Sequence, residues 1–249
     1  MENFVVSARK YRPLGFEEVV GQSHITTTLE NAINSNHLGQ ALLFCGPRGV
    51  GKTTCARILA KTINDFQSES GDSTNNFNIF ELDAASNNSV EDIRNLIEQV
   101  RYPPQQGKYK VYIIDEVHML SNQAFNAFLK TLEEPPEYAI FILATTEKHK
   151  VIPTILSRCQ IYDFNRIEVK DIVYQLEKIA KKEQVEAEKE ALHLIAQKAD
   201  GALRDALSIF DLITTFSSDG KITYQDTIKN LHILDYDYYF KLVEHLLQA

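Results

Sequence analysis

The most informative stretch of this chain is Gly46-Pro-Arg-Gly-Val-Gly-Lys-Thr53. It fits the pattern G-x-x-x-x-G-K-[ST], in which glycines let successive backbone N–H groups converge on phosphate oxygens. The apolar run Ala41–Phe44 precedes it, and the helix-like segment Thr54–Ile63 follows. A helix at that place presents its positive N-terminal end to the same anion. This context favours a phosphate-binding loop over an ordinary glycine-rich turn, and it predicts a bound nucleoside triphosphate.

The loop also supplies side chains for the expected ligand. Lys52 is expected to reach the β- and γ-phosphates, and Thr53 is expected to hold Mg²⁺ through its hydroxyl. The residues expected to contact the nucleotide here are Gly46, Arg48, Gly49, Val50, Gly51, Lys52, Thr53 and Thr54.

Short apolar runs predict the strands of one parallel sheet. They are almost continuously hydrophobic over four to six residues, which suits strands buried on both faces. The runs are Ala41–Phe44, Ile79–Leu82, Val111–Ile114, Ala139–Ala144 and Gln160–Phe164. Helix-like segments such as Val90–Val100 and Asn122–Leu132 lie between them. This alternation predicts a three-layer α/β fold with ligands at the carboxyl ends of the strands.

The pattern changes near Glu168, after which the sequence predicts only helices. The expected helices are Val169–Glu183, Lys189–Asp200, Ala202–Phe216 and a fourth from about Tyr224. We therefore expect a nucleotide-binding domain over residues 1–167 and a small all-α domain over residues 168–235. The polar interval Asp65–Asn78 is expected to be an exposed loop.

Composition narrows the class of protein. The formal net charge of −8 over 249 residues argues against a protein that coats nucleic acid with its whole surface, although a local basic patch and DNA as a partner stay open. No apolar run approaches the ~18 residues of a membrane helix. Cys45, Cys55 and Cys159 are far apart and form no C-x-x-C pair, which is typical of reduced intracellular thiols. A cytoplasmic location is expected.

A second motif is the stretch Val111-Tyr-Ile-Ile-Asp-Glu116, an apolar strand that ends in two carboxylates. Asp115 is expected to bind Mg²⁺, directly or through water. Glu116 is expected to orient and polarise the water that attacks the γ-phosphate. The alternative is a pair of surface acids, but the phosphate loop upstream favours the catalytic interpretation.

Two further residues refine the expected chemistry. Thr146 follows the run Ala139–Ala144, so its hydroxyl is expected between the loop and the metal strand, where it could hold the attacking water. Arg158, in Ser157-Arg-Cys159, lies far along the chain from the loop. An arginine of this kind can act as a finger on the nucleotide of a neighbouring subunit. The alternatives are a turn residue for Thr146 and a surface ion pair for Arg158.

The remaining motifs occur in a fixed order along almost the whole chain. They are Ala8-Arg-Lys-Tyr-Arg-Pro13, Val19-Val-Gly-Gln22, Glu81-Leu-Asp-Ala-Ala-Ser86, Ile114-Asp-Glu-Val-His-Met-Leu-Ser121, Leu129-Lys-Thr-Leu-Glu-Glu-Pro-Pro136, Leu143-Ala-Thr-Thr146, Ile155-Leu-Ser-Arg-Cys159 and Gly201-Ala-Leu-Arg-Asp-Ala-Leu207. Together they closely resemble the gamma/tau subunits of bacterial DNA polymerase III, which are the ATP-driven motor subunits of the sliding-clamp loader in the AAA+ class.

This resemblance implies a P-loop AAA+ domain with a five-stranded parallel sheet, followed by a helical lid. It implies ATP hydrolysis that opens the sliding clamp and loads it on primed DNA, with ATP and Mg²⁺ as cofactors. The implied partners are the delta and delta-prime subunits, further gamma/tau copies, the sliding clamp and primed DNA. Although the family is named for a DNA-directed DNA polymerase, no polymerase active site is expected in this chain.

The resemblance also assigns roles to residues. Thr146 matches the position called sensor 1, Arg158 matches the finger that acts in trans, and Arg204 matches sensor 2, a lid arginine that touches the nucleotide of its own subunit. The residues that match the adenine border are Tyr11, Arg12, Pro13, Val19 and Val20. Without the resemblance, Arg204 would be interpreted as a surface ion-pairing residue.

The chain departs from the family in two places. Relatives usually carry a zinc-binding insertion with four cysteines where this chain has the cysteine-free interval Asp65–Asn78. Structural zinc needs four Cys or His ligands, so no zinc site is expected there. The family's third domain, a helical collar, is expected to begin near Tyr236, so residues 236–249 represent only its start.

Other functions stay open at this point. One is another DNA-repair or recombination ATPase of the AAA+ class, and another is a clamp-loader scaffold subunit that does not hydrolyse ATP. Intact Lys52, Thr53, Asp115 and Glu116 argue against the scaffold. A stand-alone small-molecule kinase is disfavoured by Glu116 and by the helical lid with Arg204. In the family, the helix after Ser86 faces duplex DNA, and here that region offers Arg94 as a cation. The alternative is a solvent-facing helix that carries one arginine.

Overall fold

The computed structural model describes residues 5–64, 78–104, 107–216 and 220–231. The described residues fall into two compact units. One unit spans Arg12–Arg166, and the other combines residues 5–11 with the chain from Ile167 onward. Within these ranges, no helix is long and apolar enough to cross a membrane.

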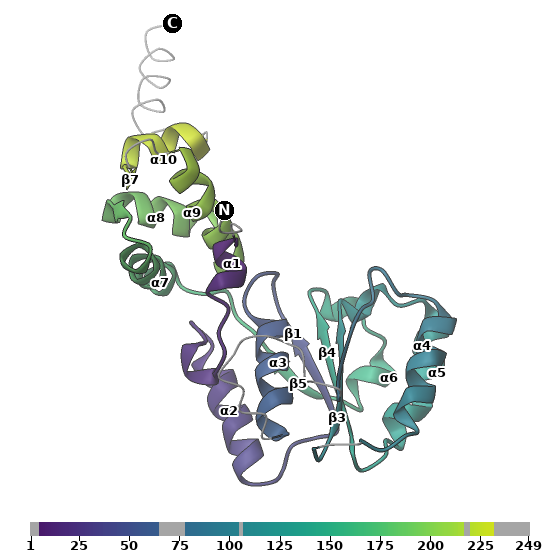
Figure 1. Cartoon of the computed structure of the whole chain (residues 1–249). Helices are drawn as coiled ribbons and strands as arrows, with labels where there is room; N and C mark the ends of the chain where they lie inside the picture. The colour runs from purple at the N-terminus through teal and green to yellow at the C-terminus, as the bar shows by residue number, and fades with distance from the viewer. Residues whose placement is uncertain (1–4, 65–77, 105–106, 217–219, 232–249) are drawn as a thin grey trace, which may run out of the picture. The chain divides into compact units, whose positions relative to one another are not determined.

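The larger unit is built on a five-stranded parallel sheet (Figure 1). Its strands are β1 (Ala41–Cys45), β2 (Ile79–Asp83), β3 (Lys110–Asp115), β4 (Ala139–Thr145) and β5 (Gln160–Asp163). Their order in the sheet is β2-β3-β4-β1-β5. Each strand lies within one residue of its expected bounds, which confirms the predicted parallel sheet. Every residue of β1 and β4 is buried, because helices cover both faces of the sheet.

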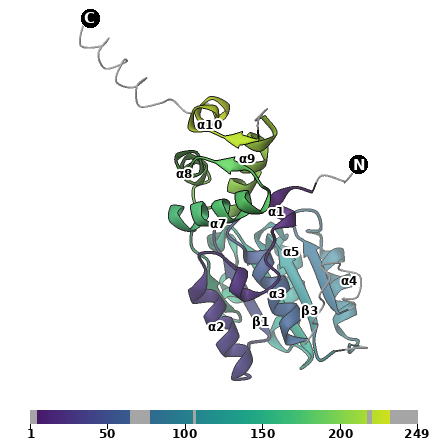
Figure 2. The same cartoon turned by 60° about the vertical axis from the view of Figure 1, so that its left-hand side comes forward.

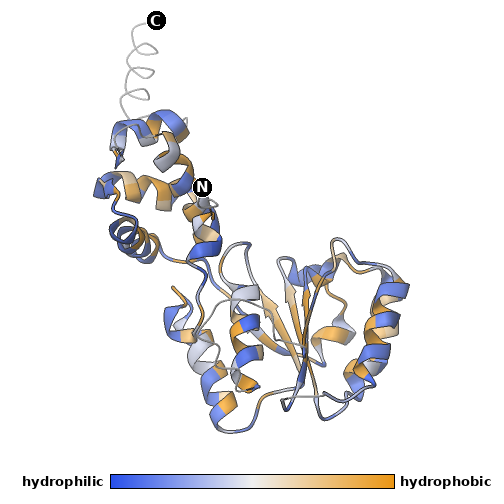
Figure 3. Ribbon diagram, viewed as in Figure 1, coloured by the Kyte–Doolittle hydropathy of each residue, from blue (hydrophilic) through white to orange (hydrophobic). Residues whose placement is uncertain are grey.

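The helices form a layer on each side of this sheet. Figure 1 shows α2 (Ser23–Asn34) and α3 (Lys52–Ile63) on one side, and α4 (Val90–Val100), α5 (Asn122–Glu133) and α6 (Pro153–Leu156) on the other. Alternate strand residues enter the two cores, since successive side chains of a strand point to opposite faces. Figure 3 shows the apolar strands between helices that are hydrophilic along their outer sides.

Neighbouring residues of β1 illustrate this division between the two cores. Leu43 packs in the core on the α4–α6 side, together with Phe128 and Phe141. Leu42 packs on the α2–α3 side, together with Leu59. The rings of Phe128 and Phe141 meet edge to face, with centroids 5.2 Å apart. Both cores hold the strands in register, and this fixes where the loops at the carboxyl ends of the strands begin.

Local sequence explains where several helices begin. α4 begins after Ser89, which forms a reciprocal capping box with Asp92. Ser121 caps α5 by accepting a hydrogen bond from the backbone N–H of Ala124. α3 begins at Lys52, two residues earlier than expected, because the phosphate loop leads directly into its first turn. The short helices are η1 (Phe16–Glu18), η2 (Val117–Met119) and η3 (Lys148–Lys150).

The smaller unit is mainly helical, as Figure 2 shows from a second side. It contains α7 (Val169–Lys182), α8 (Lys189–Lys198), α9 (Leu203–Phe216) and α10 (Tyr224–Leu231). Buried apolar residues from these helices form its core, among them Leu176, Ile195 and Phe210. It also holds a two-stranded parallel pair, β6 (Glu186–Ala187) and β7 (Lys221–Ile222). The expectation that strands stop at Glu168 is corrected by this small pair.

The N-terminal helix α1 (Ser7–Lys10) belongs to the helical unit. The backbone N–H of Ser7 donates to Asp211 Oδ2 of α9 at 2.7 Å, and Lys10 Nζ pairs with Glu183 Oε1 at 2.5 Å. The hydroxyl of Tyr11 donates to the same Glu183 carboxylate. Residues 5–11 are therefore held by contacts to the helices, whereas the sequence analysis assigned residues 1–167 to the nucleotide-binding domain.

Two expectations fall largely outside the described residues. One is the polar loop Asp65–Asn78 without a zinc site, of which the structure describes only Asn78. The other is the start of a collar domain over residues 236–249. Both stay predictions.

Candidate active site

The strand order gathers the phosphate loop, Asp115, Glu116 and Thr146 at the carboxyl ends of the strands. β4 lies between β1 and β3, and all three strands run in the same direction. The phosphate loop follows the carboxyl end of β1, and residues 145–146 stand at the end of β4. Asp115 and Glu116 stand at the end of β3. The register brings Cys45 beside Thr145. Ligands of open α/β sheets bind at this edge, outside the carboxyl ends of the strands.

The phosphate loop has a backbone that requires glycine. Gly46 has a φ of 145°, and a Cβ added there would lie 2.4 Å from the carbonyl oxygen of Phe164. Gly51, which precedes α3, has a φ of 108°. Residues with a side chain rarely adopt these backbone conformations, so glycine is needed at both positions for the loop to lead into the start of α3. Arg48 is exposed, whereas the side chain of Val50 is buried in the core on the α2–α3 side.

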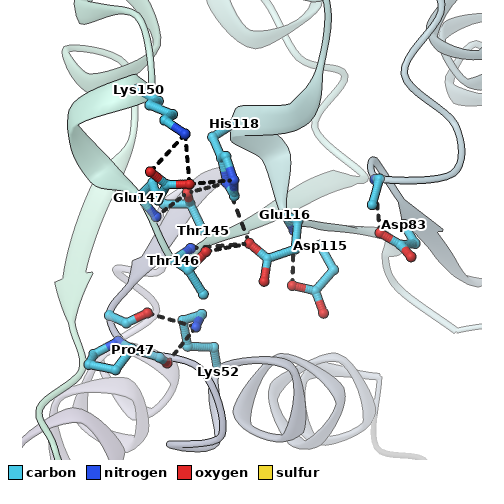
Figure 4. Close-up of polar contacts among 12 residues, drawn as sticks. Pro47, Lys52, Asp83, Asp115, Glu116, His118, Thr145, Thr146, Glu147 and Lys150 are labelled. Carbon is cyan, nitrogen blue, oxygen red and sulfur yellow. Dashed lines mark hydrogen bonds and ion pairs between the residues drawn. The ribbon is translucent and has the colours of Figure 1, made fainter.

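Lys52 is a buried cation at the start of α3, with a relative exposure of only 6%. Its ammonium donates hydrogen bonds to the carbonyl oxygens of Gly46 at 2.8 Å and Pro47 at 2.7 Å (Figure 4). Burial lowers the pKa of Lys52, and the nearby carboxylates of Glu116 and Asp115 partly oppose this shift. The two carbonyls are neutral, so an anion at the loop would compensate the buried charge far better.

Thr53 and Asp115 offer oxygen ligands for a metal. Thr53 Oγ1 donates to Asp115 Oδ2 at 2.6 Å, and the backbone N–H of Glu116 donates to Asp115 Oδ1 at 3.0 Å. Mg²⁺ prefers oxygen ligands and usually takes only one or two carboxylates, with phosphates and waters completing its shell. The two side chains therefore fit Mg²⁺ bound together with a nucleotide. In the described ranges, no three His, Cys, Asp or Glu side chains gather into a metal site.

Glu116 stands directly after β3 with a left-handed backbone, at φ 48°. Its Oε2 accepts hydrogen bonds from the hydroxyl of Thr146 at 2.8 Å and from the backbone N–H of Thr146 at 3.2 Å. A left-handed residue other than glycine costs of order 1–3 kcal/mol, and such residues cluster at functional sites. The turn directs the Glu116 carboxylate across to the end of β4, as Figure 4 shows.

His118 is a residue of this site to which the sequence analysis assigned no role. Its side chain is only 6% exposed. Its Nδ1 lies 3.0 Å from Thr145 Oγ1 and 3.4 Å from Glu116 Oε2, and its Nε2 lies 3.3 Å from Glu147 Oε1. Thr145 and Glu147 stand at and just after the end of β4, 27 and 29 positions away, so no local pattern indicates these two contacts.

Arg158 lies at the opposite edge of the sheet from the phosphate loop. It follows α6 and precedes β5, so it stands before the amino end of a strand that runs parallel to β1. One strand length, about 13 Å for four residues at about 3.3 Å each, separates the two edges. Its guanidinium donates to the carbonyl oxygen of Thr154 at 2.7 Å and forms an ion pair with Glu133.

The other expected nucleotide contacts are divided between the two units. Arg12, Pro13, Val19 and Val20 belong to the larger unit, where Val19 packs against the core on the α2–α3 side. Tyr11 and Arg204 belong to the helical unit. Arg204 is exposed in the first turn of α9, and among the described residues it forms no ion pair.

Gln22 is a second residue that sequence reasoning missed. It is fully buried, and its side-chain amide donates to the carbonyl oxygen of Asn165 at 2.6 Å and accepts from the Asn165 N–H at 3.2 Å. This pair ties the segment that carries Val19 and Val20 to the chain just after β5. Val19-Val-Gly-Gln22 was singled out only by resemblance, and a buried glutamine has no periodic signature in sequence.

Two family models match the chain. Residues 21–168 match the model described as DNA polymerase III, delta subunit, and residues 171–217 match the ATPase lid domain of the DNA polymerase III clamp loader subunit. The two matches meet close to the boundary between the compact units at residues 166 and 167.

Curated relatives match over nearly the whole chain. DNA polymerase III subunit tau of Bacillus subtilis is 50% identical over 85% of the chain, and its Escherichia coli counterpart is 44% identical over 99%. The chain spans 40% of the length of each of these two relatives. DNA polymerase III subunit gamma of Buchnera aphidicola is 40% identical over 98% of the chain, which covers 69% of that relative.

Solved structures support the fold. A RuvB structure from Thermotoga maritima, described as a Holliday junction branch migration motor, has a TM-score of 0.70 and covers 90% of this chain and 73% of its own. Its sequence identity is 23%, so the likeness concerns the architecture alone. The chain therefore has the AAA+ architecture: a parallel five-stranded sheet with helices on both faces, followed by a helical lid.

Proposed function

This chain belongs to the gamma/tau subunit family of the bacterial DNA polymerase III clamp loader, and we propose that it is an ATP-hydrolysing motor of that loader. In this role it binds ATP with Mg²⁺ and hydrolyses it to ADP and phosphate. The energy opens the sliding clamp and loads it on primed DNA. The family name refers to the polymerase holoenzyme, and we assign no polymerase chemistry to this chain.

One observation carries the proposal: the two carboxylates at the end of β3 contact both the phosphate-loop helix α3 and the end of β4. Asp115 meets Thr53 from the phosphate-loop helix at 2.6 Å, and Glu116 meets Thr146 from β4 at 2.8 Å. A scaffold that has lost hydrolysis has no need of a metal ligand and a carboxylate held at these places. The intact pair therefore favours a hydrolysing subunit over a scaffold subunit.

The roles of the residues follow from their positions. The loop N–H groups and Lys52 bind the β- and γ-phosphates, as the buried ammonium suggests. Glu116 orients the water that attacks the γ-phosphorus, and the bond from that phosphorus to the bridging oxygen breaks. Thr146 holds the Glu116 carboxylate through two hydrogen bonds and stands where a hydroxyl can also face that water.

Thr53 and Asp115 would hold Mg²⁺. The ion neutralises charge on the phosphate oxygens when it is bound. The hydrogen bond between Thr53 and Asp115 keeps both ligands in place. Around the base, we propose that Tyr11, Arg12, Pro13, Val19 and Val20 border the adenine, on the resemblance to the family.

Arg158 and Arg204 are proposed to report on assembly and on nucleotide state. Arg158 stands at the sheet edge opposite the loop of its own chain, so it suits a neighbouring subunit's ATP. Arg204 is an exposed cation on α9, and its attraction to phosphate would bias the lid between nucleotide states.

Partners and location follow the family. We propose the delta and delta-prime subunits, further gamma/tau copies, the sliding clamp and primed DNA as partners, and the cytoplasm as the location. Domain roles are proposed as a nucleotide-binding domain to residue 167, a lid over residues 168–235 and a collar from residue 236. Another DNA-repair or recombination ATPase is the alternative, and RuvB shares the fold.

The proposal is tested by clamp loading. Lys52→Ala removes the buried cation of the loop, so ATP binding and ATP-dependent loading of the clamp on primed DNA should both be lost in the assembled loader. Lys61→Ala, in the last turn of the same helix, is the matched control. Clamp loading at the wild-type rate by Lys52→Ala loaders would refute the proposal. ATP-dependent branch migration of a Holliday junction by the wild-type chain, without clamp loading, would favour the alternative.

A further inference from the structure

We propose that His118 is a positioning residue for the hydrolytic carboxylate of Glu116, and that it ties this carboxylate to the segment that follows β4. The inference rests on the proposed function, since it assigns a support to the group that orients water. It concerns a histidine whose side chain is almost fully buried yet polar at both ring nitrogens.

The Glu116 carboxylate is held at one oxygen. Oε2 receives the hydroxyl and the backbone N–H of Thr146 at 2.8 Å and 3.2 Å, and His118 Nδ1 lies 3.4 Å away on another side. A carboxylate with one oxygen held in this way leaves Oε1 for a water molecule. Catalytic geometry depends on side chains that are locked by a surrounding shell of hydrogen bonds.

The ring of His118 is itself held at both ends. Nδ1 lies 3.0 Å from Thr145 Oγ1, and Nε2 lies 3.3 Å from Glu147 Oε1. A neutral imidazole carries its proton on one nitrogen only. A proton on Nδ1 lies between Glu116 Oε2 and Thr145 Oγ1, whereas a proton on Nε2 faces Glu147 Oε1 and leaves Nδ1 to accept from the Thr145 hydroxyl. Only a proton on Nδ1 lets the ring donate towards Glu116, so the proposed support assigns a proton to that nitrogen.

Glu147 extends the connection outward. Its carboxylate pairs with Lys150 Nζ at 2.8 Å and lies 3.6 Å from His149 Nε2, and its backbone N–H donates to Thr145 Oγ1 at 3.0 Å. These groups belong to the end of β4 and to η3, at the surface of the unit. Figure 4 shows the resulting chain from Lys150 through Glu147 and His118 to Glu116. A shift of η3 would therefore move the ring that supports Glu116.

The test separates turnover from binding. His118→Ala should lower the ATP turnover of the assembled protein at saturating ATP by about 10- to 100-fold, the scale of a misplaced catalytic group, while the Kd for ATP stays at its wild-type value. His118→Asn keeps an amide nitrogen near the place of Nδ1 and should recover part of the turnover. The exposed His37→Ala serves as the matched control.

A double-mutant cycle shows whether His118 acts through Glu116. In a Glu116→Gln background, His118→Ala should cause no further loss of turnover. A full additional loss in that background overturns the inference, as does wild-type turnover of His118→Ala alone. A parallel loss of ATP affinity, or a failure of His118→Asn to exceed His118→Ala when both fold, also overturns it. Unchanged turnover of Glu116→Gln itself would instead refute the proposed function, and the role of His118 with it.

Discussion

Thr53 Oγ1 donates a 2.6 Å hydrogen bond to Asp115 Oδ2, which joins the helix after the phosphate loop to the tip of a strand 62 residues further along the chain. The bond places two oxygen ligands of different elements side by side, and neither is an exposed surface group. A divalent cation that arrives with a nucleotide would replace the shared proton as the link between them.

We predict that Thr53→Val, which keeps the shape of the side chain but removes its oxygen, weakens the use of Mg²⁺. The Mg²⁺ concentration that half-saturates ATP turnover should rise on the order of 10-fold, the scale of a lost polar partner. Thr62→Val is the control, because the Thr62 hydroxyl donates to the Ile58 carbonyl oxygen within the same helix, away from Asp115. An identical Mg²⁺ dependence of Thr53→Val and the wild type would contradict the metal assignment.

Gly46→Ala should damage the loop more than its small size suggests. The new Cβ would lie 2.4 Å from the Phe164 carbonyl oxygen, at a φ of 145°. Gly220→Ala is the control, since Gly220 also has a positive φ of 67° but has open space around it. We expect Gly220→Ala to cost on the order of 1–3 kcal/mol of stability and Gly46→Ala to cost more.

The readouts for these two variants are urea unfolding and ATP binding. Only Gly46→Ala should lose ATP affinity, because only its loop faces the phosphates. Equal stability and full ATP affinity of Gly46→Ala would show that the loop tolerates a side chain and that its close approach to β5 has no function.

Much of the larger unit could be predicted from the sequence. The predicted bounds of the five strands differ from those of the structure by at most one residue. Runs such as Val111–Ile114 are apolar throughout, which is typical of strands that are covered on both faces of a sheet. The placement of Lys52, Thr53, Asp115 and Glu116 could also be predicted. Lys52 and Thr53 belong to the phosphate-loop motif that follows β1, Asp115 and Glu116 stand at the end of β3, and the carboxyl ends of parallel strands lie at the same side of a sheet.

What could not be predicted depends on contacts distant in sequence. α1 joins the helical unit through Asp211, which is 204 positions from Ser7, and no local pattern encodes that contact. β6 and β7 have two residues each, too few to show an alternation of polar and apolar side chains. His118 is part of a motif that was recognised, but its partners Thr145 and Glu147 become neighbours only when β4 pairs with β3.

Lys52 predicts a specific pH dependence of stability. Burial lowers the pKa of Lys52 in the folded chain below its usual value of 10.5, so the unfolded chain binds this proton more tightly. The buried charge therefore costs stability at neutral pH, and the cost is relieved as pH rises from the lowered pKa towards 10.5.

Lys52→Met keeps most of the side chain and removes the charge. Without nucleotide, it should raise the free energy of unfolding at pH 7 and flatten the increase of stability with pH. ATP with Mg²⁺ should stabilise the wild type but not the variant. If the nucleotide-free variant were less stable than the wild type at pH 7, as measured by urea unfolding, the buried Lys52 charge would not be destabilising in the absence of phosphate.

Arg158 should act on the ATP of a neighbouring subunit. An Arg158→Ala chain keeps its phosphate loop, and a Lys52→Ala chain keeps its finger. In assembled loaders each variant alone should have turnover lower by roughly 10³–10⁵-fold, the scale of an arginine finger. Mixtures of the two contain interfaces where an intact loop faces an intact arginine, so activity should reappear in proportion to such interfaces.

The control is a chain that carries both Arg158→Ala and Lys52→Ala. Mixed with either single variant it should restore no turnover, because no interface then joins an intact loop to an intact arginine. Wild-type turnover of the Arg158→Ala protein alone, in loaders stimulated by DNA, would show that the arginine has no role in trans. The ion pair of Arg158 with Glu133 would then be its main contribution.

The most direct test of the account is single-turnover hydrolysis by Glu116→Gln in the assembled loader, measured beside ATP affinity. The glutamine keeps the size of the side chain and leaves Asp115 and Thr53 intact, but it cannot orient water as a carboxylate does. The account predicts ATP bound with wild-type affinity and cleaved at least about 100-fold more slowly, the lower part of the range for a general base. Wild-type cleavage of bound ATP by Glu116→Gln would contradict it.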